Sequence, residues 1–321
     1  MLEIIVFLAA LAICIKGSDW LGRSSVNWAR QFRLPSFIVG ATFVAVATSL
    51  PELVIATVAG PINHEPNLAL GVVLGSPLIN IGIILALSLF VTKQRPKLGY
   101  FSRAINIFLV LAILLLVISL NTSFGNPINI LLIALGILFV MLEFVIGGKS
   151  QTISENIEHR FQIIVGFFSF TKERESLFEF IFGALFLLVG SSFMVTSALS
   201  IASTFQINEL FLSATIIALG TSLPELVTTL NALVHKREDL ALGVLVGASV
   251  IDLSIGVGLG SLFSQTRINY PINLIFFIPL ILVGVLCLLT FWKKIPIQII
   301  AGLLITTVFL FVFIFSIYEI F

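Results

Sequence analysis

Long apolar runs separated by short polar segments dominate the sequence. Ten of these runs are close to the roughly 20 residues that an α-helix needs to cross about 30 Å of hydrocarbon. Lipid offers the backbone no hydrogen-bond partner, so runs of this kind are expected to be helical. The pattern therefore predicts an all-α membrane protein with ten transmembrane helices. The predicted spans are residues 2–22, 37–60, 67–91, 102–120, 127–146, 177–200, 208–234, 240–264, 271–292 and 295–318.

Composition supports a membrane protein and excludes an ordinary soluble domain. The chain is 59% hydrophobic and only 10% charged, whereas soluble domains carry roughly 25% charged residues. The net charge of +1 gives no indication of a nucleic-acid partner, and the expected surroundings are the lipid bilayer. The two cysteines, Cys14 and Cys287, both lie in apolar runs, so neither a disulfide nor a metal site is predicted from them.

The positions of Lys and Arg predict the orientation. Of the 17 basic residues, all but Arg267 lie in the segments that follow the first, third, fifth, seventh and ninth spans. Cytoplasmic segments of membrane proteins are enriched in Lys and Arg. We therefore expect a multi-pass protein of the plasma membrane with both termini outside.

The longest polar segment divides the chain into two similar parts. Residues 147–176 mix charges of both signs and are read as a cytoplasmic linker. The linker separates a first five-helix repeat, residues 1–146, from a second one, residues 177–321. Because five is an odd number, the two repeats would enter the membrane in opposite senses. Inverted-topology repeats are typical of secondary transporters, which bind their substrates near the bilayer midplane.

A duplicated motif supports this division. The stretches Ala41–Leu53 and Ala214–Leu226 align without a gap at an offset of 173 residues, which is the separation of Glu52 and Glu225. Each glutamate follows a proline and lies in an otherwise apolar run. A charge at membrane depth costs about 2.5–3.5 kcal/mol, so two charges in matching surroundings indicate a shared function.

The polar residues of the apolar spans all offer oxygen atoms, with no His or Cys among them. Thr48 and Thr221 each precede a glutamate by four residues, which places each pair on one helix face. Oxygen ligands suit hard cations such as Ca²⁺ and Na⁺. Two glutamates balance one Ca²⁺, while three carboxylates would balance three Na⁺ or be partly protonated. The candidates are Glu52, Glu225, Asp252, Asn80, Thr48, Thr221, Ser49, Ser222 and Ser76.

The two motifs, together with Gly75–Asn80 and Gly247–Asp252, resemble the two alpha repeats of the calcium/cation antiporter superfamily. The resemblance is greatest to prokaryotic sodium/calcium exchangers and covers the whole chain. The resemblance implies that Ca²⁺ is bound by Glu52, Glu225, Thr48 and Thr221. It implies one flanking Na⁺ site formed by Ser76, Thr48 and the Ala45 carbonyl, and an opposite Na⁺ site formed by Ala218 and Thr221. Asn80 and Asp252 would lie beside the centre, while Ser49 and Ser222 would belong to the motif and satisfy freed backbone groups.

One departure from that family bears on Na⁺ binding. Ala248 stands where the family has a serine equivalent to Ser76, and Ser249 follows one residue later. Adjacent residues lie about 100° apart around a helix. Either Ser249 substitutes through a local shift, or one Na⁺ site has lost a ligand.

We therefore expect a secondary antiporter that exchanges Na⁺ for Ca²⁺ by alternating access, with no cofactor and as a monomer. A proton-coupled Ca²⁺ exchanger is the alternative, motivated by Ala248 and the titratable Asp252. An intramembrane hydrolase is disfavoured, because the sequence has no His-Glu-x-x-His or Gly-x-Gly-Asp element, and no enzymatic activity is expected.

Overall fold

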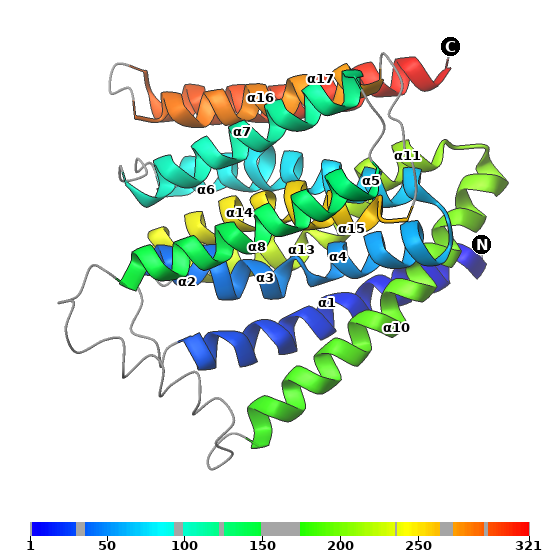
Figure 1. The fold of residues 1–321 in the computed structure, drawn as a ribbon, viewed down its shortest axis with the longest axis horizontal. Helices are drawn as coiled ribbons and strands as arrows, with labels where there is room; N and C mark the ends of the chain where they lie inside the picture. The colour runs from blue at the N-terminus through cyan, green and yellow to red at the C-terminus, as the bar shows by residue number, and fades with distance from the viewer. Residues whose placement is uncertain are drawn as a thin grey trace.

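The computed structural model describes residues 2–29, 36–92, 99–121, 125–148, 174–234, 236–263, 272–291 and 295–320. Within these ranges every regular element is a helix and no strand occurs (Figure 1). The predicted all-α class is confirmed for this part of the chain. Most of the predicted linker, residues 149–173, lies outside the described residues.

The helices are listed here in chain order, with wider π-helical turns inside several of them. The α-helices are α1 (Leu2–Ala29), α2 (Ser36–Val39), α3 (Ala45–Thr48), α4 (Leu50–Thr57), α5 (Pro66–Pro77), α6 (Leu85–Thr92), α7 (Tyr100–Asn121), α8 (Asn126–Gly148), α10 (Arg174–Phe205), α11 (Glu209–Leu212), α12 (Ala218–Thr221), α13 (Leu223–Val234), α14 (Glu238–Ile251), α15 (Val257–Gly260), α16 (Ile272–Leu289) and α17 (Ile297–Ile320). The π-helical turns are η2 (Gly40–Val44), η3 (Val58–Ile62), η4 (Leu78–Ile84), η5 (Ser213–Ile217) and η6 (Asp252–Gly256).

Six helical rods in the described part of the chain are long and apolar enough to cross a membrane. A seventh arises if the bent pair Phe37–Thr48 and Leu50–Ile62, which meet at 41°, forms one span. Val189–Phe205 and Asn273–Leu289 are apolar but shorter. The chain is thus a multi-pass membrane protein.

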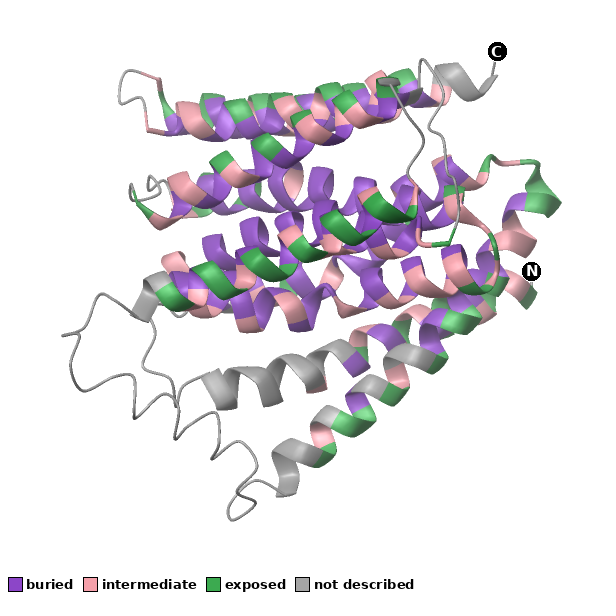
Figure 2. Ribbon diagram, viewed as in Figure 1, coloured by how far each residue is buried: buried purple, intermediate pink, exposed green. Residues whose placement is uncertain are grey.

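Two rods form the centre of the bundle. In an apolar stretch of 18 residues within Pro66–Thr92, 94% is buried; the share is 89% within Glu238–Gly260 and only 28% within Asn126–Val145. Figure 2 shows this as a buried centre with exposed residues on the outer helices. The helices that carry Asn80 and Asp252 are therefore the core, and the others turn apolar faces to lipid.

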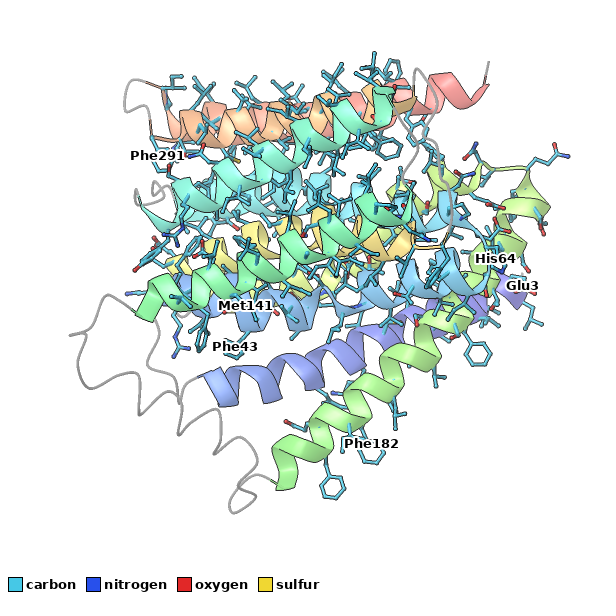
Figure 3. The ribbon with its side chains drawn as sticks, viewed as in Figure 1. Glu3, Phe43, His64, Met141, Phe182 and Phe291 are labelled. Carbon is cyan, nitrogen blue, oxygen red and sulfur yellow. The ribbon has the colours of Figure 1, made fainter. Side chains whose placement is uncertain are left out.

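The outer helices lie along opposite edges of this core. In Figure 1, α1 and α10 run side by side along one edge, and α16 and α17 along the other. Figure 3 places Glu3 and His64 at one end of the bundle and Phe291 at the opposite end, while Phe182 points away from the helices. The start of α1 and the α4–α5 turn therefore share one end.

Two glycines let the central rods approach helices from the other half of the chain. A Cβ atom at Gly75 of α5 would overlap the Ala214 carbonyl oxygen in η5. A Cβ at Gly247 of α14 would lie 2.5 Å from the Ala41 carbonyl oxygen in η2. Small residues allow membrane helices to pack backbone against backbone. These contacts bring each glutamate-bearing rod against the core rod of the opposite half.

An ion pair joins α7 to α8 away from the centre. Glu143 is only 1% exposed, and the guanidinium of Arg103 donates to both of its carboxylate oxygens, from Nε to Oε1 at 2.9 Å and from Nη2 to Oε2 at 2.5 Å. A paired carboxylate can be buried where a lone one would be costly.

Candidate cation site

Both glutamates follow a break in a helix. In the first half, α3 ends at Thr48, Ser49 lies between the helices, and Glu52 falls in the first turn of α4. In the second half Ser222 occupies the break, and Glu225 falls in the first turn of α13. Proline at the second position of each new helix suits such a start, because its missing N–H would be unpaired there anyway. The partial positive charge of a helix N-terminus also favours a carboxylate.

The carbonyls one turn before each break are held in the same way in both halves. The Ala45 oxygen accepts from the Ser49 N–H at 2.9 Å and from the Thr48 hydroxyl at 3.3 Å. The Ala218 oxygen accepts at 3.0 Å from the N–H at position 222 and at 3.2 Å from the hydroxyl of Thr221. A threonine hydroxyl that donates to a carbonyl still has oxygen lone pairs for a cation.

The three intramembrane carboxylates lie together and are completely buried. Glu52, Glu225 and Asp252 are each 0% exposed. Glu52 lies within electrostatic range of the other two, and Asp252 within range of Glu225. Among the described residues, no hydrogen-bond partner is found for either carboxylate oxygen of Glu52 or Glu225, nor for Oδ1 of Asp252. Buried carboxylates are costly unless they are paired or coordinate a cation, so this cluster is suited to a cation.

The threonines meet the glutamates of the opposite half. Thr221 lies beside Glu52, and Thr48 stands in the same relation to Glu225. Neither hydroxyl proton is directed at the carboxylate, because both threonines donate to the carbonyl three residues back. Each pair of a threonine oxygen and its facing carboxylate therefore offers a cation lone pairs from both halves of the chain. A two-fold relation between the halves would produce this arrangement.

Ser76 connects the remaining polar groups. Its hydroxyl donates to Oδ2 of Asp252 at 2.8 Å, accepts from Nδ2 of Asn80 at 3.3 Å and shares a hydrogen bond of 3.1 Å with the hydroxyl of Ser222. A serine hydroxyl has one proton and two lone pairs, so these three contacts use all of them. Ser49 also lies beside Asp252. Ser49 thus borders a carboxylate directly, whereas Ser222 reaches the same cluster through the Ser76 hydroxyl.

Ser249 lies differently from Ser76. Its hydroxyl donates to the Leu245 carbonyl of its own helix at 2.8 Å. Ala248, the residue at the matching position, is completely buried and has no side-chain oxygen. Ser249 therefore does not hold the place in the second half that Ser76 holds in the first.

No group of three or more His, Cys, Asp or Glu side chains in the described part of the chain is arranged to hold a metal ion. The carboxylates alone therefore do not form such a group. Hydroxyl and carbonyl oxygens would have to complete a cation site, which favours hard cations over metals that prefer nitrogen or sulfur.

Sequence reasoning missed Thr229. This residue lies one turn after Glu225, is completely buried, and its hydroxyl has no hydrogen-bond partner among the described residues. The signal that points to it is a hydroxyl four residues after the glutamate on the same helix face.

The comparisons with known proteins agree with this geometry. The sequence model of the sodium/calcium exchanger protein family matches residues 2–171 and 175–318. An uncharacterized membrane protein of Methanocaldococcus jannaschii is 31% identical over 257 residues, which cover 80% of this chain and 80% of that protein. The sodium/calcium exchanger MaX1 of Methanosarcina acetivorans is 24% identical over 321 residues, covering 89% of this chain and 90% of the exchanger.

The fold also matches a solved exchanger. A structure of the sodium-calcium exchanger NCX_Mj, soaked with 10 mM Na⁺ and no Ca²⁺, superposes with a TM-score of 0.68 at 26% identity. The match covers 96% of this chain and 97% of that one. The family model spans nearly the whole sequence, and the arrangement of helices agrees with it. The chain therefore belongs to the sodium/calcium exchanger family of prokaryotic membrane cation antiporters.

Proposed function

We propose that this protein exchanges Na⁺ for Ca²⁺ across the plasma membrane by alternating access. The observation that carries the proposal is the pair of buried glutamates, Glu52 and Glu225, which lie close together. Their carboxylates have no hydrogen-bond partners among the described residues, and each is faced by a threonine of the opposite half. A buried site of this charge needs a cation. Alternating access lets the same site take its cation from either side.

Ca²⁺ is the divalent ion that the central oxygens suit best. Ca²⁺ takes about six to eight oxygen ligands in flexible geometry. The carboxylates of Glu52 and Glu225, the hydroxyls of Thr48 and Thr221, and backbone carbonyls would supply them. The two negative charges balance one Ca²⁺, so the occupied site would be neutral inside the membrane.

Na⁺ would use overlapping ligands, and this overlap accounts for exchange. Ser76 with Thr48 and the Ala45 carbonyl would form one flanking Na⁺ site, beside Asn80 and Asp252. To bind Na⁺, the Ser76 hydroxyl would release one of the donors that now occupy its lone pairs. Because the same glutamates would neutralise either ion load, Na⁺ and Ca²⁺ would exclude each other.

The opposite Na⁺ site would consist of Ala218 and Thr221 without a contribution from Ser249. The bond from Ser249 to Leu245 supports this, since it turns the hydroxyl toward its own helix. We propose that this second site binds Na⁺ more weakly than the first.

We further propose ten spans arranged as two inverted five-helix repeats, with residues 147–176 as the cytoplasmic linker and both termini outside. The paired π-helical turns support the repeat, because Gly40–Val44 and Ser213–Ile217 are separated by the same 173 residues as the glutamates. The start of α1 and the end of α17 lie at the same side of the bundle in Figure 1, as an even number of spans requires. All proposed ligands come from one chain, so a monomer carries a complete site.

The helices α1 and α10 are the proposed moving part. They pack mainly against each other at one edge of the bundle (Figure 1). Gly190 of α10 lies directly against Cys14 of α1, so the two helices touch closely and would move as a pair. The core rods are largely buried and would stay in place while this pair exposes the site to each side in turn.

Proton-coupled Ca²⁺ exchange is the second candidate. The observation that favours it is Ala248, which leaves the second Na⁺ site short of an oxygen, together with Asp252, a carboxylate that a proton could neutralise instead.

Uptake of radiolabelled Ca²⁺ into proteoliposomes tests the proposal. Vesicles are loaded with Na⁺, with K⁺ or with choline at clamped pH, and the neutral variant Glu52→Gln/Glu225→Gln serves as the control. Uptake that requires internal Na⁺ and is lost in the double variant supports Na⁺/Ca²⁺ exchange. Uptake indifferent to Na⁺ but driven by a pH gradient favours proton coupling. Uptake that survives in the double variant refutes the site.

A further inference from the structure

The residue one turn beyond each glutamate differs between the two halves. Ala56 follows Glu52 by four residues, and Thr229 follows Glu225 by four. The two positions match at the 173-residue offset of the repeat, and both are completely buried. One half therefore has a methyl group where the other half has a hydroxyl.

The hydroxyl of Thr229 is unusual among those of the described helices. Buried or partly buried Thr and Ser side chains in this chain commonly donate to the carbonyl one turn back, as Thr42 does to Ile38 at 2.7 Å and Thr57 to Leu53 at 2.7 Å. Such back-bonding is the ordinary state of a hydroxyl inside a membrane helix. Thr229 makes no such bond. A buried polar group without a partner is costly, so this oxygen needs an explanation.

The hydroxyl lies on the face of α13 that carries Glu225. Glu225, Thr229 and Ala232 form a buried stripe along α13, while Val227 and Leu230 are exposed. This helix packs against α14, against η4 and against α6. Three oxygens on one helix face, the two of Glu225 and the one of Thr229, thus lie without partners between α13 and the core of the bundle.

The corresponding position in the first half lies against small residues. A Cβ atom at Gly260 would lie 3.5 Å from the Cβ of Ala56, and a Cβ at Gly60 would overlap the carbonyl oxygen of Gly260. Backbones touch there, and the side chains at this contact offer no oxygen. The counterpart of Gly260 in the first half is Ser88 on α6. The match follows from the offset of 172 residues at which Gly75–Asn80 aligns with Gly247–Asp252.

The two helices that carry these positions run to opposite ends of the protein. Helix α4 runs from Glu52 toward the turn that carries His64, at the end where Glu3 lies (Figure 3). Helix α13 runs from Glu225 toward Lys236 and Arg237, which the distribution of basic residues places on the cytoplasmic side. The Thr229 hydroxyl therefore lies on the cytoplasmic side of Glu225.

We propose that the Thr229 hydroxyl and the Glu225 carboxylate form an additional Na⁺ position on the cytoplasmic side of the central site. One carboxylate and neutral oxygens carry a single negative charge, which suits a monovalent hard cation. The position would receive Na⁺ between the cytoplasm and the flanking sites. The identity of the ion and the exchange it takes part in rest on the proposed function.

Substitution of Thr229 with sidedness resolved tests the proposal. The variant Thr229→Val keeps the side-chain shape and removes the oxygen, Thr229→Ser keeps the oxygen, and Thr57→Val removes a hydroxyl that is bonded to its own helix. Release of radiolabelled Ca²⁺ by added Na⁺ is measured from inverted vesicles, which present the cytoplasmic face, and from right-side-out vesicles.

The expected result is confined to one variant and one face. Thr229→Val raises the half-saturating Na⁺ concentration about fivefold to tenfold on the cytoplasmic face, the effect of losing one polar ligand. Its extracellular value, and both values for Thr229→Ser and Thr57→Val, stay at wild type. An unchanged cytoplasmic value, or an equal shift on both faces, overturns the proposal. If valine does not give a folded protein, Thr229→Ala removes the same oxygen with a smaller side chain and is judged by the same outcomes.

A second measurement separates this inference from the proposed function. Na⁺ is titrated against the unfolding temperature of the purified wild-type and Thr229→Val proteins in detergent, which needs no Ca²⁺ transport. Wild-type protein that fails to exchange Na⁺ for Ca²⁺ refutes the proposed function alone. A Thr229→Val protein that Na⁺ stabilises as strongly as wild type, at the same concentrations, overturns the additional Na⁺ position alone.

Discussion

Replacing Ser76 and Ser249 by alanine, one at a time, compares two buried serines that differ only in what their hydroxyls contact. Both side chains are 0% exposed, so the same atom is lost from an equally buried position. Ser76 donates to the Asp252 carboxylate at 2.8 Å and also contacts Asn80 and Ser222. Ser249 makes one neutral hydrogen bond, to the carbonyl of Leu245 in its own helix.

The expected magnitudes follow from these partners. A hydrogen bond to a charged group contributes about 1.5–3 kcal/mol, whereas a neutral one contributes about 0.5–1.5 kcal/mol. The Leu245 carbonyl also keeps its helical partner after Ser249→Ala, so that variant falls at the low end. Since about 1.4 kcal/mol corresponds to tenfold in an equilibrium constant, Ser76→Ala should raise the half-saturating Na⁺ concentration by roughly tenfold to a hundredfold. Ser249→Ala should change it by no more than about threefold.

The assay is Na⁺-dependent Ca²⁺ uptake into proteoliposomes over a Na⁺ titration, with thermal unfolding of each variant as the check that it is folded. Equal effects of Ser76→Ala and Ser249→Ala would refute the reasoning, because the serine bonded to its own backbone would then matter as much as the one at the carboxylates. A neutral Ser76→Ala would refute it as well.

Two further predictions concern the second half of the site and the packing around it, and a third concerns the ion pair between α7 and α8. Ala248→Ser restores an oxygen at the position that matches Ser76 and should lower the half-saturating Na⁺ concentration severalfold in the same uptake assay; an unchanged value would contradict a missing ligand there. Gly75→Ala drives a methyl group into the carbonyl of Ala214, and overpacking of this kind should lower stability by about 1–3 kcal/mol or more, seen as a lower unfolding temperature. Arg103→Ala leaves the buried carboxylate of Glu143 unpaired and should lower the free energy of unfolding by up to about 3 kcal/mol, the low end for a buried pair, because Arg103 itself is 32% exposed. Adding Glu143→Gln should recover part of this loss, and no recovery would argue against the pair.

Much of the architecture was predictable because the signals are local and strong. An apolar run of membrane length can only be satisfied as a helix in lipid. Most observed helices follow the predicted runs within a few residues, whereas α1 continues to Ala29 and α10 to Phe205. A proline before a glutamate in such a run predicts an interrupted helix, and breaks occur at Ser49 and Ser222 as expected. The choice of hard cations followed from composition alone, since no His or Cys accompanies the carboxylates.

The sequence alone was less informative about individual hydroxyl groups. Ser49 and Ser222 were predicted both as candidate ligands and as groups that satisfy the backbone. In the structure Ser49 lies beside Asp252, and Ser222 contacts Ser76. Ser249 was left open as a substitute for the missing serine, and its hydroxyl faces its own helix. Thr229 was not singled out at all, because one threonine in an apolar run ordinarily bonds to its own backbone.

The sequence by itself determined the membrane class, the helical fold and the two interrupted helices, and it predicted the oxygen chemistry of the candidate site, because hydrophobic length, proline and the cost of a buried charge act within a few residues. Only the tertiary structure decided that Thr221 meets Glu52 and Thr48 meets Glu225, and that Ser76 and Ser249 differ. The contacts of the two threonines with the glutamates, and of Ser76 with Asp252, join residues more than a hundred positions apart. They cross between helices whose closest approach is set by glycines such as Gly75. The partner of a side chain depends on how closely two helices approach each other and on the rotamer of that side chain. The local sequence pattern predicts neither.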